Sequence, residues 1–198
     1  MINDTNDRIR YVSFKYFLEK GYEATNIRDI CNEVGIKASS LYFYYKSKEE
    51  LFFSIYDEIS SERNRCFNET GDLDYISPDM RLYCIYKRIM NYTAEDIVKQ
   101  RFLLRYLLFP TEEITKLLRE KYQYWKDKEN IVILNLIKQC MENDILSVNN
   151  NPNDYLHKYN KFISVQTIET IISNIKTSYL EQDLEWTKFW NSIMIRGI

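Results

Sequence analysis

The stretch that decides the fold runs from Arg8 to Leu51 and reads RIRYVSFKYFLEKGYEATNIRDICNEVGIKASSLYFYYKSKEEL. Apolar residues recur at three- and four-residue intervals in its first part, as they do on one face of an α-helix. Gly21 ends this pattern, as a glycine often does after the last turn of a helix. A second helical pattern follows Thr25, a residue type that caps helix N-termini, and stops at Gly35. The stretch therefore predicts two helices with a short loop between them.

A short third helix is expected after the Gly35 turn, from about Ala38 to Tyr45, with Leu41 on its inner side. Two helices joined by a tight turn that contains glycine are typical of a helix-turn-helix motif. The major groove of B-DNA admits one α-helix, and the preceding helix of the motif crosses the DNA backbone. The sequence therefore predicts that the third helix binds DNA. Ser47 and Glu50 then predict a capped fourth helix.

The residues expected to face DNA are small, hydroxylated, aromatic or basic. Small side chains at the start of the third helix would let its backbone approach base edges, and Lys37 can reach phosphate or guanine. Tyrosine hydroxyls can donate to phosphate oxygens, and a lysine at the start of the fourth helix lies where a phosphate is favoured. The predicted set is Thr25, Lys37, Ala38, Ser39, Tyr42, Phe43, Tyr44 and Lys48. For Thr25 a purely capping role stays open, as does simple surface packing for Tyr42 and simple solvation for Lys48.

These 44 residues resemble the DNA-binding domain of the tetracycline-repressor (TetR) family. The landmarks are F..KGYEAT..RDI, the Gly35 turn, LYFYY and KSKEEL, at the spacing of the family. Lys37 stands where the family usually has Ser, and Ser39 where Gly is common. The resemblance implies a DNA-binding domain over residues 1–48, and a helical ligand-sensing and dimerisation domain over residues 49–198.

The composition of the chain favours an all-α fold. Of its 198 residues 45% are hydrophobic and 15% aromatic, while only 4 are Gly and 3 are Pro, too few for an all-β chain with many tight turns. About nine helices are expected, with no convincing strand. The formal net charge is -2, so DNA binding must rest on a local patch. Residues 8–48 hold eight basic and four acidic side chains, a modest positive excess.

Proline, glycine and capping residues predict the later helix ends. Helix starts are expected at Ser77-Pro78 and near Thr93, a stop and restart at Pro110, and a loop over residues 149–152. The last two helices are expected over about residues 154–180 and 183–195.

The penultimate helix carries apolar residues on two sides, which predicts that it packs on two sides. The final helix is rich in tryptophan, which is common at interfaces. Two such helices from each subunit would form a four-helix dimer interface, as the resemblance implies. The predicted interface residues are Phe162, Val165, Ile172, Ile175, Trp186, Trp190 and Ile193. A monomeric core completed by both helices is the alternative.

The central helices are rich in aromatic residues, which can line a pocket for an apolar, aromatic or cationic effector. The predicted lining is Tyr83, Tyr86, Phe102, Tyr106, Tyr122 and Trp125. Each of these residues could equally belong to an ordinary core.

An enzyme is the competing class of protein, but the sequence offers no catalytic apparatus. The one histidine, His157, has no nucleophile or metal-ligand pattern around it, and no glycine-rich phosphate loop occurs. No metal and no cofactor are expected. The four widely spaced cysteines, the lack of a signal peptide and the lack of a membrane span predict a cytoplasmic protein with reduced thiols. The expected partners are double-stranded DNA, a second copy of the chain and a small-molecule effector, with no membrane.

These observations together predict a sequence-specific transcriptional regulator. The first expectation is a repressor that a small molecule releases from an inverted-repeat operator. The alternative is a ligand-independent, architectural DNA-binding protein of the same fold.

Overall fold

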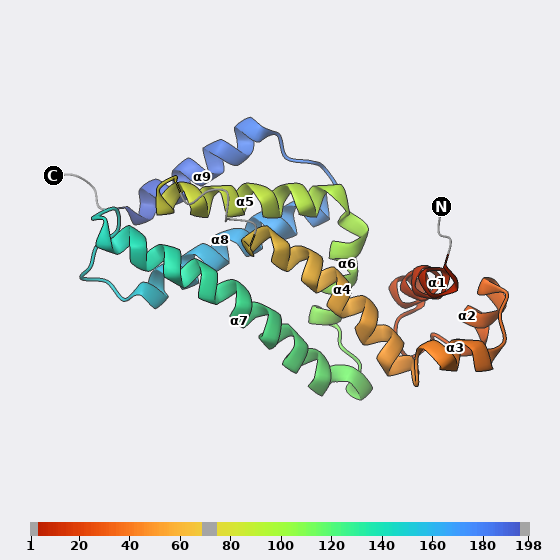
Figure 1. The fold of residues 1–198 in the computed structure, drawn as a ribbon. Coiled ribbons are helices and arrows are strands. Elements are labelled where there is room, and N and C mark those ends of the chain that lie inside the picture. The colour runs from red at the N-terminus through yellow and green to blue at the C-terminus, as the bar shows by residue number, and fades with distance from the viewer. Residues whose placement is uncertain (1–3, 69–74, 195–198) are drawn as a thin grey trace. The chain divides into compact units, whose positions relative to one another are not determined.

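The computed structural model describes residues 4–68 and 75–194, and within these ranges it contains nine α-helices and no strand (Figure 1). The all-α prediction is therefore confirmed. The helices are α1 (Thr5–Lys20), α2 (Ile27–Val34), α3 (Ala38–Tyr44), α4 (Lys48–Asn68), α5 (Pro78–Glu95), α6 (Ile97–Leu108), α7 (Glu112–Glu142), α8 (Pro152–Ser173) and α9 (Tyr179–Ile193).

The capping signals place several helix ends correctly. Gly21 follows α1 with a φ of 84°, and its N–H donates to the carbonyl of Phe17. The Ser47 hydroxyl accepts from the N–H of Glu50 at 3.0 Å, so α4 has its predicted cap. The Glu50 carboxylate reaches the N–H of Lys46 at 2.7 Å, one residue before the cap. Pro78 is the first residue of α5, as predicted.

The predicted boundary between the last two helices, about residues 180–183, is wrong. The helix α8 stops at Ser173, because Asn174 adopts the left-handed conformation with a φ of 56°. The helix α9 starts at Tyr179, where Ser178 and Glu181 form a complete capping box. These local signals end α8 and start α9, although apolar residues continue to recur at helical spacing between the two helices.

The chain forms two compact units. The first comprises the residues up to Ser61 and Val98–Tyr122, and the second comprises Glu62–Ile97 and the residues from Gln123 onward. These units differ from the expected ranges 1–48 and 49–198, because most of α6 and the start of α7 pack with α1 and α4. Sequence periodicity shows that one side of a segment is buried, but it does not show which other segment that side packs against.

Aromatic residues from α1, α4 and α6 form the core of the first unit. Phe52 is central, with ring centroids 5.2 Å from Phe17, 5.7 Å from Phe102 and 4.7 Å from Tyr106. The Tyr106 hydroxyl donates to the carbonyl of Phe17 at 2.9 Å. Edge-to-face aromatic pairs contribute about 0.5–1.5 kcal/mol beyond the area they bury. This packing anchors α1, on which α2 and α3 rest.

The core of the second unit lies between α5, α7, α8 and α9. Trp186 and Trp190 are 8% and 7% exposed and stack with ring centroids 5.2 Å apart. Trp186 also stacks on the fully buried Tyr86 at 5.7 Å. The tryptophans of α9 therefore complete the core of their own chain.

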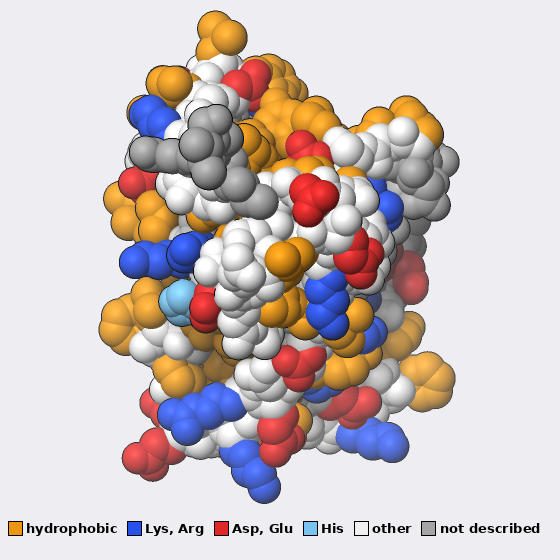
Figure 2. Space-filling model, turned by 90° about the vertical axis from the view of Figure 1, so that its left-hand side faces the viewer, with side chains coloured by type: hydrophobic (Ala, Val, Ile, Leu, Met, Phe, Trp, Pro, Cys, Tyr) orange, Lys and Arg blue, Asp and Glu red, His pale blue; other side chains and the backbone are white. Residues whose placement is uncertain are grey.

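The face shown in Figure 2 carries separate basic and acidic groups among hydrophobic ones, and neither sign covers it. Any attraction to DNA must therefore come from a limited region, as the net charge of -2 already requires.

Candidate nucleic-acid interface

The turn between α2 and α3 depends on Gly35, which adopts the left-handed conformation with φ 79° and ψ 36°. Its N–H donates to the carbonyls of Cys31 and Asn32, and the N–H of Ile36 donates to Cys31 at 3.0 Å. A side chain at this position would meet no atom within 4 Å. The glycine is therefore required by the backbone angle and not by lack of space.

Two long-range hydrogen bonds hold the motif on α1. The guanidinium of Arg8 donates to the carbonyl of Val34 at 2.8 Å, at the end of α2. The hydroxyl of Tyr45 donates to the side-chain oxygen of Asn6 at 2.7 Å, just after α3. Because each helix of the motif is bonded to α1 at its C-terminal end, the orientation of α3 is set by the rest of the unit.

The outer face of α3 is defined by its one fully buried residue, Leu41. At about 100° per residue, Ser39 and Phe43 lie about 160° and 200° around the helix axis from Leu41. Tyr42 lies on one flank of this outer face and Ser40 on the other, and Tyr44 lies beyond Ser40, about 60° from Leu41. The exposed fractions agree with this order, at 85% for Phe43, 50% for Tyr42 and 38% for Tyr44.

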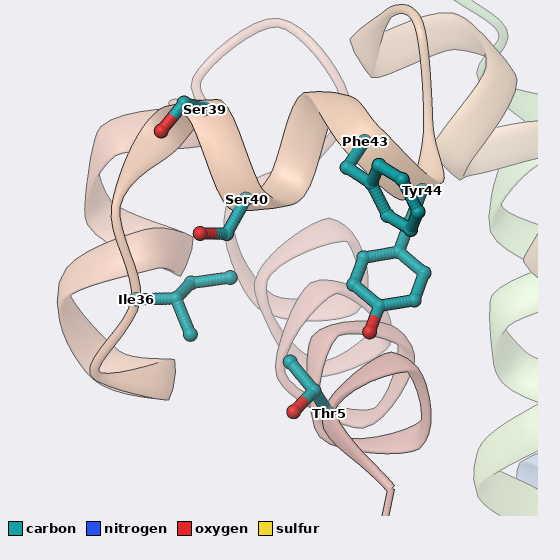
Figure 3. A pocket seen from close by; sticks show the side chains of 6 residues that line it. All are labelled: Thr5, Ile36, Ser39, Ser40, Phe43 and Tyr44. Carbon is teal, nitrogen blue, oxygen red and sulfur yellow. The ribbon is translucent and has the colours of Figure 1, made fainter.

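An open groove with a volume of about 510 Å³ borders α3 (Figure 3). It is lined by Thr5, Ile36, Ser39, Ser40, Phe43 and Tyr44. Ser40 and Tyr44, one helical turn apart, project from the same side of α3, and the Tyr44 hydroxyl points toward Thr5. Four of the lining residues carry hydroxyl groups, which can donate hydrogen bonds to phosphate oxygens without adding charge.

Thr5, Ile36 and Ser40 belong to this surface, although the sequence pattern did not predict them. The spacing of Ser40 and Tyr44 was a signal for Ser40, because residues four apart share one side of a helix. Thr5 could not be found in this way, because it reaches the groove from α1 through the tertiary fold.

Lys37 is the cap of α3, and Lys48 begins α4 a few residues after α3 ends. Lys37 is exposed and makes no side-chain hydrogen bond as the cap of α3, so its charge faces solvent. Lys48, the first residue of α4, donates from Nζ to the carbonyl of Tyr22 at 3.0 Å and lies 4.3 Å from the centre of that ring. Burial raises the pKa of Tyr22, whose hydroxyl donates to Glu113 at 3.1 Å. The Lys48 charge is thus held in one place beside a neutral tyrosine.

Thr25 differs from its predicted place. Asn26 is the cap of α2, since its side chain accepts from the N–H of Arg28 at 2.9 Å. Thr25 is 2% exposed and donates its hydroxyl to the carbonyl of Gly21 at 2.6 Å. Its hydroxyl is therefore used inside the protein. Among the predicted DNA-binding residues, Lys37, Ala38, Ser39, Tyr42, Phe43 and Tyr44 are exposed.

The predicted effector-binding residues are divided between the two units. Phe102 and Tyr106 belong to the aromatic core of the first unit, and Tyr83 and Tyr86 contact Trp186 in the second. Tyr86 is fully buried and its hydroxyl donates to the carbonyl of Gln182. Tyr122 is 40% exposed and Trp125 is half-buried. For Phe102, Tyr106 and Tyr86 the alternative interpretation, ordinary core, describes the structure.

The predicted interface residues divide into an inward and an outward group. Trp186, Trp190 and Ile193 are buried in the core of their own chain, and Phe162 is half-buried against it. Val165, Ile172 and Ile175 are 44%, 75% and 67% exposed. The exposed side of α8 therefore stays a predicted interface, whereas Trp186, Trp190 and Ile193 of α9 lie on the side that faces their own chain.

No three His, Cys, Asp or Glu side chains in the described part of the chain are placed to hold a metal ion. None of the helices in residues 4–68 and 75–194 is long and apolar enough to cross a membrane. Cys31, Cys66 and Cys140 are buried free thiols, as predicted, and burial raises the pKa of Cys140 to about 12.

Comparison with known sequences places the N-terminal segment in a family. Residues 11–55 match the family described as bacterial regulatory proteins, tetR family. The HTH-type transcriptional regulator YerO of Bacillus subtilis is 36% identical over 73 residues, which cover 36% of this chain and 25% of that protein. IcaR of Staphylococcus epidermidis, a negative transcriptional regulator of the biofilm operon icaADBC, is 44% identical over 46 residues. These residues cover 23% of this chain and 25% of IcaR. The match spans about a quarter of the length of each relative.

Comparison with solved structures extends the similarity of fold to the whole chain. A regulatory protein in the tetR family from Rhodococcus RHA1 superposes with a TM-score of 0.71 at 16% identity, over 98% of this chain and 100% of that one. The ketosteroid transcriptional regulator KstR2 of Mycobacterium tuberculosis superposes with a TM-score of 0.66 at 17% identity, over 99% of this chain and 98% of that one. The segment that contains α2 and α3 thus matches the tetR family of bacterial regulatory proteins, and the chain as a whole shares the fold of solved regulators.

Proposed function

We propose that this chain is a DNA-binding transcriptional regulator and not an enzyme, with α3 in the major groove. The observation that carries the proposal is the outer face of α3, where Ser39 and Phe43 are central and tyrosine hydroxyls flank them. A face of this kind suits a groove whose floor is base edges and whose walls are phosphates. Lys37, the cap of α3, and Lys48, the first residue of α4, supply charge.

The proposed regulator acts as a homodimer. Seven apolar residues of α8, α9 and the segment between them are at least 39% exposed and form what we name the α8–α9 strip. Its members are Val165, Ile168, Ile172, Ile175, Tyr179, Leu180 and Leu184. Exposed apolar residues gathered along neighbouring helices are typical of an association surface, and two-fold association is the commonest kind. A second copy of this strip is the simplest cover for it.

A two-fold dimer would bind an inverted repeat, with its two α3 helices in successive major grooves. Because IcaR is a negative regulator, we propose repression for this chain as well. In this proposal a small molecule that binds the DNA-free form more tightly weakens DNA binding by the same factor, through linkage.

The second candidate is a ligand-independent DNA-binding protein of the same fold. The observation that favours it is the packing of the predicted effector-binding residues. Tyr86 and Tyr106 are fully buried, and their hydroxyls are bonded to backbone carbonyls. In this alternative the helical part serves dimerisation alone.

The test is selection of bound sequences from a random double-stranded DNA pool, followed by binding titrations on the enriched sequence. Enrichment of a palindrome bound by two copies of the chain supports the proposal. If no sequence is enriched, the chain is not a sequence-specific regulator. A screen for small molecules that shift the thermal midpoint and release DNA then separates the two candidates.

A further inference from the structure

The side chains of α3 do not include those that usually identify bases by hydrogen bonding. The helix reads ASSLYFY, without Arg, Lys, Asn, Gln, Asp or Glu. Arg and Lys pair with guanine, Asn and Gln with adenine, and Asp and Glu with cytosine in the major groove. Serine hydroxyls both donate and accept and can bond to several bases. Apart from Lys37 at its cap, α3 therefore has no side chain that pairs strongly with one base, and part of its base selection must come from another kind of contact.

Phe43 is the residue of α3 that is placed to supply an apolar contact with a base. It is 85% exposed and lies at the centre of the outer face, nearly opposite the buried Leu41. Its ring makes an edge-to-face contact with Tyr44 at 5.4 Å, which leaves most of its apolar surface uncovered. The residue one turn earlier on the same face is Ser39, which is too small to keep DNA away from the ring.

The major groove offers one prominent apolar group, the C5-methyl of thymine. Tyr42 lies on one flank of α3, and Tyr44 lies about 60° from Leu41 on the other side; both carry hydroxyls, which suit the phosphate backbones that border the groove. Ala38 is apolar and exposed, but it lies about 60° from Leu41, on the inner side of the helix. Phe43 is therefore the apolar side chain of α3 best placed to contact a thymine methyl.

We propose that Phe43 is a specificity-determining residue that packs on a thymine C5-methyl, so that each half-site contains a T·A pair facing the centre of α3. The proposal rests on the proposed DNA-binding function and adds which base is selected and how. Selection by shape and apolar contact takes the place of the missing bidentate hydrogen bonds.

The experiment uses the full chain and the palindrome selected from the random pool. Each thymine of the half-site is replaced in turn by deoxyuridine, in both half-sites at once, which removes only the methyl group and keeps base pairing. We expect one position at which the replacement weakens binding by about fourfold per half-site, the factor for losing one buried methyl-sized group. The other thymines should change affinity little.

Coupling to Phe43 is the decisive measurement. The variant Phe43→Ala should bind thymine and deoxyuridine operators with equal affinity, and Phe43→Leu should keep part of the preference. Phe109→Ala is the matched control, since Phe109 is a phenylalanine with 74% exposure outside the helix-turn-helix. This control should retain both the affinity and the preference of the unmodified chain.

The possible outcomes distinguish a failure of this inference from a failure of the proposed DNA-binding function. If a palindrome is bound but no thymine is sensitive to loss of its methyl, Phe43 does not select thymine. If the sensitivity persists in Phe43→Ala, another residue contacts the methyl and the proposal is overturned. If no sequence is enriched at all, the proposed function itself fails, and the inference fails with it.

Discussion

The ammonium group of Lys48 lies 3.0 Å from the carbonyl oxygen of Tyr22 and 4.3 Å from the centre of the Tyr22 ring. An ammonium group has three protons, so one bond to a carbonyl leaves two for a phosphate. Lys48 is the first residue of α4, where free N–H groups and the helix dipole also favour an anion. The contact with Tyr22 therefore fixes a positive charge in advance at a place suited to the DNA backbone.

Replacing Lys48 with Met should weaken binding to all DNA sequences alike. The substitution keeps the length and apolar stem of the side chain and removes its charge. A dimer would lose two phosphate contacts, so the slope of log affinity against log salt should flatten by roughly two. Titrations at four or more salt concentrations, on the selected operator and on unrelated DNA, measure this slope.

Lys188→Met is the control for loss of charge, because Lys188 is an exposed lysine paired with Glu185 on α9. Its slope should equal that of the unmodified chain. An unchanged slope in Lys48→Met would show that Lys48 has only a structural role on Tyr22.

The local parts of the fold could be predicted from residue types whose effect is independent of the remaining chain. Gly35 is required because the backbone there is left-handed, and Ser47 is favoured because its hydroxyl caps a free N–H group of α4. Each effect involves residues no more than four positions apart in the sequence. Thr25 and Asn26 show the limit of such signals. Both are good caps, but the Thr25 hydroxyl is bonded to the carbonyl of Gly21, and the Asn26 side chain caps α2.

The direction in which an apolar residue faces was the less predictable quantity. Trp190 and Ile172 are equally reasonable interface residues by type and spacing, yet one is 7% and the other 75% exposed. Periodicity finds two apolar sides of a helix but does not state which side meets its own chain. Phe102 and Tyr106 show the same limit, because their partners Phe17 and Phe52 lie far away in sequence.

The α8–α9 strip predicts opposite results for two similar substitutions. Ile172→Asp places a charge on the strip, so it should give folded monomers where the unmodified chain forms dimers. Trp190→Asp places an unpaired charge in the protomer core, so it should unfold the chain. Sedimentation gives the mass of each variant, and circular dichroism its helix content.

Ile131→Asp is the control for an added surface charge, since Ile131 is 69% exposed on α7. It should remain dimeric. A folded dimer for Ile172→Asp, or a monomer for the unmodified chain at micromolar concentration, would rule out the strip as the interface.

Asp183 should make stability depend on acid pH. Its carboxylate accepts from Lys87 at 2.7 Å and from Tyr83 at 2.5 Å, and these bonds hold the pKa of Asp183 below its ordinary value of 3.8. Since the folded-state pKa is the lower one, the contribution is complete above about pH 4 and is lost as the pH falls through the folded value. The free energy of unfolding should therefore drop more steeply below pH 4 in the unmodified chain than in Asp183→Asn.

Urea unfolding at several pH values between 3 and 6 would test this dependence. The effect should be small, because the Asp183 side chain is 48% exposed and solvent screens its ion pair. The Tyr83 hydroxyl stays a donor throughout, since burial and the Asp183 carboxylate raise its pKa to about 12. Equal pH slopes for the two proteins would show that the Lys87 and Tyr83 contacts do not persist in solution.

Gly35 allows backbone strain to be separated from steric exclusion. A methyl group added there would meet no atom within 4 Å, so Gly35→Ala should lose stability only through its φ of 79°. The left-handed conformation costs a residue with a Cβ roughly 1–2 kcal/mol, and Asn adopts it more readily than Ala. Gly35→Asn should therefore be the more stable variant when both are unfolded in urea. The comparison is Gly21→Ala, where φ is 84° and the added Cβ would also lie 2.9 Å from the Arg105 guanidinium. If Gly35→Ala is as stable as the unmodified chain, the turn before α3 tolerates another backbone geometry and its angle does not depend on glycine.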